Sequence, residues 1–177
     1  MKDLLEPFRG SPAQTAVVKT ILGHGLRIMA NKAYCGDIEI SDSAIARAAD
    51  ADRRVVRTTI EKISSSDSLS RIFSNIRSMT MLSEVAPEIG CSVIEIIPTD
   101  EKMPGILAGI METISESGVS IRQAAVLDPA FGSDVAKLVI IFDGKLPPEY
   151  LASVRSCRGA RCSRRVRPVP SSSGHWS

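Results

Sequence analysis

The sequence predicts an α+β protein in two parts: a helical N-terminal part and a C-terminal part in which strands and helices alternate. In the first part, apolar residues recur at helical spacing behind residues that favour helix starts. The second part opens with a run rich in β-branched residues, 91–98, which favours a buried strand. The spacing of an amphipathic helix then returns between residues 106 and 114. We therefore expect two domains, residues 1–80 and 91–163, joined by a connector over residues 81–90.

Composition places the chain among folded globular proteins. Of its 177 residues, 44% are hydrophobic and 24% are charged. No run approaches the roughly 20 apolar residues of a membrane span, and the N-terminus lacks a signal-peptide core. We expect a cytoplasmic protein with no membrane partner. The four cysteines are irregularly spaced, which favours reduced thiols and argues against structural zinc.

The first domain is predicted to begin with a long helix and a very short strand. Ser11 suits the N-cap of the helix and Pro12 its first position, where a missing N–H is harmless. Apolar spacing extends the helix from Pro12 to about residue 30, with a break left open at two glycines in its second half. Alternation over residues 37–41 predicts the strand. A later helix is expected to bury four apolar residues: Leu69, Ile72, Phe73 and Ile76.

Two short helices separated by a tight turn are predicted over residues 41–63. Ser41 and Asp52 are suitable N-caps, and residues 50–52 form the turn. Inward-facing positions of the second helix are spaced i, i+4 and i+7: Val56, Ile60 and Ile63. This pattern resembles a helix-turn-helix unit, in which the second helix enters the major groove of double-stranded DNA. The resemblance implies four DNA-binding residues on the outward face of that helix: Arg53, Arg54, Arg57 and Thr58.

DNA contact and a purely structural role are both open for this helix pair. Arginine can bind guanine edges or phosphates, and threonine can contact a phosphate or a thymine methyl group. Asp50, however, occupies a turn position where glycine is usual, and nearby acidic residues almost cancel the positive charge. Because DNA affinity comes largely from neutralising phosphates, a monomer should bind weakly and a dimer more strongly. No hairpin pattern follows the second helix, so we expect a helical unit rather than a full winged helix.

The second domain is predicted to have the order strand, helix, strand, strand, helix, strand. Strands are expected at 91–98, 119–127 and 137–143, the second helix at about 149–158, and a poorly defined last strand near 160–166. Proline in the first turn and glycine just past the last turn delimit the first helix: Pro104 and Gly118. This is the element order of the ferredoxin-like superfold, which hosts many unrelated functions.

The first helix of this domain also carries a more specific pattern. Pro-Gly-x-Leu opens it at residues 104–107, and Gly-Val-Ser-Ile closes it at residues 118–121. In this order of elements, the two motifs resemble the ACT domain, a small amino-acid-sensing module. Together with the helix-turn-helix, the chain up to Gly159 resembles regulators of amino-acid metabolism predicted in archaea. The resemblance implies an amino-acid-responsive transcriptional regulator that forms a homodimer or higher homo-oligomer through its ACT-like domain.

The resemblance implies an effector site around the start of the first helix. Backbone N–H groups and the positive end of the helix dipole suit a ligand carboxylate there, and glycine allows close approach. Asp100 could accept the ligand ammonium, although in the family the motif aspartate usually lies nearer to Pro-Gly. Alternatively, Pro104, Gly105 and Gly118 serve only as helix start and stop. The expected effector-binding residues are Asp100, Met103, Pro104, Gly105, Ile106, Leu107, Ser120 and Ile121.

Charge is unevenly divided along the chain. The net charge of +2 is the sum of +1 in residues 1–90, −3 in residues 91–159 and +4 in residues 160–177. A general polyanion-binding surface is therefore not supported by bulk charge. Residues 164–177 are predicted to be disordered or altered, and a basic arm, a distorted edge strand and an altered C-terminus remain open for the region after Gly159.

Enzymatic function is not expected. The sequence shows no Cys/His or Ser/His/Asp constellation, no glycine-rich phosphate loop and no metal-ligand spacing, so we expect no cofactor. An alternative function is a regulatory subunit of the ACT type whose N-terminal helices bind an enzyme partner instead of DNA. A steep salt dependence of DNA affinity would distinguish the regulator from this alternative.

Overall fold

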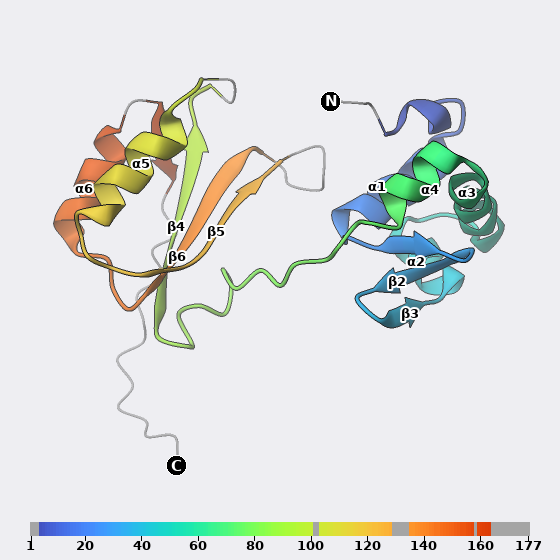
Figure 1. Ribbon diagram of the computed structural model, residues 1–177, viewed down its shortest axis with the longest axis horizontal. Helices are drawn as coiled ribbons and strands as arrows, with labels where there is room; N and C mark the ends of the chain where they lie inside the picture. The colour runs from blue at the N-terminus through green and yellow to red at the C-terminus, as the bar shows by residue number, and fades with distance from the viewer. Residues whose placement is uncertain (1–3, 101–102, 129–134, 158, 164–177) are drawn as a thin grey trace, which may run out of the picture. The chain divides into compact units, whose positions relative to one another are not determined.

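The computed structural model describes residues 4–100, 103–128, 135–157 and 159–163. Within these ranges the chain divides into two compact units, residues 4–80 and residues 81–163. Helices are combined with two antiparallel sheets, which confirms the α+β class (Figure 1). None of the helices in the described ranges is long and apolar enough to cross a bilayer. The tail over residues 164–177 lies outside the described residues.

The first unit packs helices against one face of a small sheet. Its core takes buried apolar side chains from the helices and from the sheet, with Phe8, Val56 and Phe73 almost fully enclosed. The sheet is an antiparallel meander in the order β1-β2-β3. The elements are η1 (Glu6–Phe8), α1 (Pro12–Gly23), β1 (Arg27–Met29), β2 (Lys32–Cys35), β3 (Ile38–Ile40), α2 (Asp42–Ala48), α3 (Arg53–Ser65) and α4 (Asp67–Phe73).

Three predicted helix starts are confirmed by their capping hydrogen bonds. The side chain of Ser11 accepts from the Gln14 amide at 3.4 Å, and that of Ser41 accepts from the Ala44 amide at 3.2 Å. Asp52 accepts from the amide of Arg54 at 2.7 Å at the start of α3. Each bond satisfies an N–H group that the first helical turn leaves without an intrahelical partner. These caps fix where the helices begin.

The helix predicted from Pro12 to about residue 30 is interrupted at the break that the two glycines had left open. Helix α1 ends at Gly23, and the chain turns at Gly25, whose φ is +62°. A Cβ at that position would lie 2.7 Å from the Cα of Ser78, so the backbones approach closely there. Ala30 and Asn31, with φ of 50° and 58°, then form the two-residue turn between β1 and β2.

The first unit contains more strand than expected, because a three-stranded sheet precedes α2 where only one very short strand was predicted. The very short strand predicted over residues 37–41 is confirmed as β3. Inward-facing residues in the sheet belong to the core: Ile28 is 2% exposed and Ala33 is 1% exposed. With only three or four residues in each strand, the alternation was too short to stand out against the helical spacing before it.

The second unit has the predicted order of elements. Its sheet runs in the order β5-β6-β4-β7, with all neighbouring strands antiparallel, and both helices lie on one face of it (Figure 1). A last strand is therefore present after Gly159. The elements are β4 (Cys91–Pro98), α5 (Ile106–Ser115), β5 (Ile121–Leu127), β6 (Lys137–Asp143), α6 (Pro148–Ser156) and β7 (Ala160–Ser163).

Strand alternation divides the second unit into two apolar layers. On the helix side, Ile94, Ile140 and Phe142 pack with Ile110 and other residues of α5 and α6. On the opposite side, the alternate residues of β4 and β6 pack with the fully buried Ala86 of the connector. The connector thus covers part of the sheet face that the helices leave open.

The start of α5 differs from the prediction. Pro104 was expected in the first helical turn, but the helix begins at Ile106 and Pro104 lies in the preceding turn. Gly105 is the N-cap and has φ of +87°, a left-handed conformation that the helix cannot include. Gly118, with φ of +68°, takes the predicted left-handed position after the helix.

Candidate functional site

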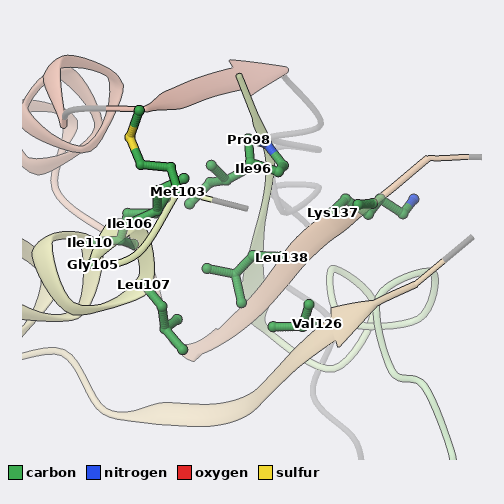
Figure 2. Close-up of a pocket in the computed structure, with 11 residues that line it drawn as sticks. Ile96, Pro98, Met103, Gly105, Ile106, Leu107, Ile110, Val126, Lys137 and Leu138 are labelled. Atoms are coloured by element: carbon green, nitrogen blue, oxygen red, sulfur yellow. The ribbon is translucent and has the colours of Figure 1, made fainter. Parts of the chain in front are cut away.

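A pocket of about 220 Å³ lies beside the N-terminal end of α5 (Figure 2). Side chains from α5 and from strands β4, β5 and β6 converge on it. We call it the α5 pocket. Four of the predicted effector-binding residues line it: Met103, Gly105, Ile106 and Leu107.

Local structure explains why these elements meet there. Ile96 faces the helices from the last part of β4, which ends at Pro98. Ile106 and Ile110, four residues apart in α5, lie on the same side of the helix and face the sheet. Val126 of β5 pairs with Leu138 of β6, so both side chains point to the helix side.

The other predicted effector residues are not gathered in the pocket of a single chain. Asp100 and Pro104 are exposed and precede the helix, but they are outside the pocket lining. Ser120 is exposed and precedes β5, while Ile121 pairs with Phe142 at the far end of that strand from Val126. Contact of Ser120 and Ile121 with the ligand stays a prediction that requires a second copy of the chain.

The polar groups at the pocket come mainly from the backbone. The N-cap Gly105 provides no side-chain hydrogen bond, and the first bond of the helix runs from the Gly109 amide to the Gly105 oxygen at 3.1 Å. Within the part of the chain that the structure describes, no side chain caps the amides of the first turn. Lys137 also lines the pocket, but its ammonium group pairs with Glu95 at 3.3 Å and points away from the other lining side chains (Figure 2).

Gly159 supports the pocket from outside its lining. A Cβ on this residue would lie 3.0 Å from the sulfur of Met103 and 3.0 Å from side-chain carbons of Ile106. Its φ of +82° also favours glycine. This role could not be predicted from local sequence patterns, because the contact joins residues more than fifty positions apart.

Sequence reasoning missed most of the apolar wall of the pocket, which includes Ile96, Ile110, Val126 and Leu138. The first, second and fourth were recognised only as apolar positions of strands or helices. Such positions have the same pattern whether they fill a core or line a cavity. Val126 is 67% exposed, which only the structure reveals.

The second candidate site is the outward face of α3. Its inward residues are as predicted, since Val56, Ile60 and Ile63 are all 0% exposed. The turn from α2 to α3 includes Asp50 in a left-handed conformation, with φ of 48°. The helix pair therefore uses a left-handed turn residue, but with aspartate instead of glycine.

All four predicted DNA-binding residues lie exposed on α3, at Arg53, Arg54, Arg57 and Thr58. Arg57 donates to Glu61 at 2.9 Å and lies 3.9 Å from a carboxylate oxygen of Asp42. Within the described ranges, Arg53 and Arg54 make no ion pair, so their charges are the more available. The hydroxyl group of Thr58 donates to the Val55 carbonyl at 3.1 Å.

Comparisons with known proteins leave the family open. No protein-family model matches the chain, and no curated protein matches it. The leucine response regulatory protein LrpA of Mycobacterium tuberculosis matches with 14% identity and a TM-score of 0.28, and a point mutant of Rv3291c with 12% identity and a TM-score of 0.28. Both matches cover 86% of this chain and 88% of the other chain. At these TM-scores the two similarities establish neither a family nor a function.

Proposed function

We propose that the protein is an amino-acid-responsive transcriptional regulator of amino-acid metabolism. It binds double-stranded DNA through α3 and an amino acid in the α5 pocket. The observation that carries the proposal is the position of this pocket. It lies at the uncapped start of α5 and is lined by Met103, Gly105, Ile106 and Leu107, which the ACT-like motif singled out.

The start of α5 suits the carboxylate of an amino acid. Its N–H groups and the positive end of the helix dipole both favour an anion, with a dipole contribution of about 0.3–1 kcal/mol at an exposed terminus. The position of a Cβ on Gly105 has no heavy atom within 4 Å, so a ligand can approach the backbone there. Asp100 is the proposed partner of the ligand ammonium group.

A homodimer is supported by the edge of the second sheet. Strand β5 is an edge strand, and its side chains Ile121 and Val126 are 40% and 67% exposed. Antiparallel pairing of two β5 strands would bring the start of one beside the end of the other. Ser120 and Ile121 of a second copy would then approach the pocket. These two predicted effector-binding residues would contact the ligand across the dimer interface.

DNA binding is proposed for the exposed start of α3. Arg53 and Arg54 supply positive charge, Arg57 supplies more when it leaves Glu61, and Thr58 adds a hydroxyl group. One such face neutralises few phosphates, so binding requires the two faces of a dimer. The amino acid would act by favouring one dimer geometry and hence one spacing of the two α3 helices.

Strand β5 offers a route for this coupling. Val126 faces the pocket, whereas the side chain of Gln123 accepts a hydrogen bond from the amide of Leu82 at 3.1 Å. Leu82 belongs to the connector that leads to the first unit. A ligand that moves the end of β5 therefore acts on the strand that holds the connector.

Two measurements test the proposal together. Thermal unfolding with each common amino acid at millimolar concentration should show a selective rise in midpoint, because a ligand of the native state stabilises it. Fluorescence anisotropy with a duplex selected from a random library should show an affinity that this amino acid changes. DNA affinity that is the same with and without every amino acid would refute the proposal.

A regulatory subunit that binds an enzyme is the second candidate function. It is favoured by the two carboxylates beside Arg57 and by the net charge of only +1 in residues 1–90. On this alternative, the protein would still bind an amino acid but would show no steep fall in DNA affinity with salt. We propose no catalytic residues and no cofactor for either function.

A further inference from the structure

We infer that the effector is an amino acid with an aliphatic side chain, such as leucine, isoleucine, valine or methionine. This inference rests on the proposed function and specifies the ligand class of the same pocket. The ligand chain enters the apolar part of the α5 pocket, while its carboxylate meets the start of the helix.

The described lining of the pocket is apolar apart from its backbone. Ile96, Ile110 and Leu138 are 1%, 0% and 8% exposed and form its inner wall. Lys137 contributes no charge to the cavity, because its ammonium group is paired with Glu95. A ligand hydroxyl, amide or charged group placed against this wall would lose its water without gaining a partner. Polar side chains are therefore disfavoured.

The outer part of the pocket is also apolar and incompletely covered. Leu107 is 46% exposed and Val126 is 67% exposed, on opposite elements of the lining. An aliphatic ligand chain between them removes apolar surface of both side chains from water, as well as its own. The gain grows with each methylene of the ligand that becomes buried.

The size of the cavity suits one amino acid. The volume of about 220 Å³ is below the range of about 300–1,000 Å³ that is typical for drug-sized molecules. Gly105 at the start of α5 belongs to the lining, and the other described lining side chains are apolar apart from Lys137. This lining matches a small molecule with an anionic head and an aliphatic chain.

The first experiment uses a homologous series with the full-length protein. Dissociation constants for alanine, 2-aminobutyrate, norvaline and norleucine are measured by calorimetry. Each added methylene should strengthen binding roughly fourfold until the pocket is full, which corresponds to about 0.8 kcal/mol. Threonine should bind roughly 10- to 100-fold more weakly than valine, which has the same shape without the hydroxyl group. An affinity that does not depend on chain length would overturn the inference.

A variant at the rim tests the location of the ligand chain. Val126→Asn should weaken leucine binding more than tenfold and have little effect on stability, since the side chain is largely exposed. The matched control is Ile38→Asn, another exposed aliphatic residue in a short strand, at 70% exposure and in the first unit. Equal leucine affinity in Val126→Asn and wild type would overturn the assignment of the chain to this pocket.

The outcomes also separate this inference from the proposed function. Selective binding of a polar, charged or aromatic amino acid would overturn the aliphatic class and leave the amino-acid sensor intact. Binding of 4-methylpentanoate, which is leucine without its ammonium group, with no binding of any amino acid would refute the sensor. That result would confirm the apolar pocket but overturn the inference that its ligand is an amino acid.

Discussion

The ion pair between Arg57 and Glu61 offers a sharp test of the proposed DNA-binding face. Glu61→Gln removes one carboxylate that holds Arg57 at 2.9 Å. The two side chains are 52% and 51% exposed, so their pairing contributes only about 0.3–0.5 kcal/mol to the stability of the folded protein. We therefore expect a folded variant in which Arg57 is free to bind a phosphate.

The expected salt dependence of DNA affinity follows from the number of phosphates that the arginines neutralise. With only Arg53 and Arg54 of each protomer engaged, a dimer neutralises four phosphates, and the slope of log K against log salt is about −4. Arg57 would raise the count to six and the slope to about −5. A carboxylate roughly 7 Å from a phosphate repels it by about 0.6 kcal/mol in water, so its removal favours the free energy of DNA binding by that amount per protomer. For a dimer this corresponds to a roughly tenfold higher DNA affinity.

The assay is fluorescence anisotropy with a selected duplex between 50 and 200 mM salt, concentrations at which the two slopes predict roughly 250-fold and 1,000-fold losses of affinity. The control is Glu39→Gln, since Glu39 pairs with Lys32 at 2.8 Å with side chains that are 52% and 51% exposed in the same unit. Glu61→Gln should bind DNA more tightly and with a steeper slope than this control. Equal affinity of the two variants would refute the assignment of the α3 face.

Three further variants test the backbone conformations on which the two units depend. Gly25→Ala should lose about 1–3 kcal/mol more stability in urea unfolding than Gly36→Ala. Both glycines have positive φ, but only a Cβ at Gly25 would meet backbone atoms, at 2.7 Å. Equal losses of stability in the two variants would contradict this. Replacing Ala30 by Asn together with Asn31 by Gly should raise the urea midpoint of the first unit, since Asn-Gly favours a two-residue hairpin turn with positive φ; an unchanged midpoint would contradict it. Gly159→Ala should cost about 1–2 kcal/mol of stability and weaken leucine binding in calorimetry, because its Cβ presses on two residues of the pocket; unchanged affinity would show that the pocket tolerates the contact.

Local chemistry explains which elements could be predicted from the sequence. The caps at Ser11, Ser41 and Asp52 involve residues two or three positions apart, so their signals are complete within a short window. Strands β4 and β6 are long enough for their apolar runs to be clear. These signals require no knowledge of how the chain folds back on itself.

Contacts between distant residues explain which elements could not be predicted. The turn at Gly25 depends on the approach of Ser78, and the first hairpin turn lacks the Asn-Gly pair that usually marks one. Pro104 satisfied the rule for a first helical residue, but the left-handed Gly105 after it delays the helix. A local rule therefore gave the right helix with the wrong start.

The region where α5 begins could be predicted from the sequence, but the strand residues that line the pocket could not. The Pro-Gly-x-Leu pattern located the region where α5 begins, while the apolar wall of the pocket depends on the register that places Val126 opposite Leu138. That register includes a bulge between Ile121 and Gln123, where one extra residue shifts the facing of the strand. No period-2 pattern reveals such a shift in advance.

In the proposed coupling, the bulged strand β5 links the pocket to the connector, and Gln123 tests this directly. Gln123→Met removes the acceptor for the Leu82 amide, whereas Gln123→Glu retains an oxygen at the same position. The first change should cost about 0.5–1.5 kcal/mol of stability, the net contribution of one such hydrogen bond. If β5 carries the coupling, Gln123→Met should bind the amino acid and DNA separately, yet the amino acid should no longer change DNA affinity. Gln123→Glu should retain the response. An undiminished response in Gln123→Met, measured by anisotropy at saturating amino acid, would show that the coupling runs through other contacts.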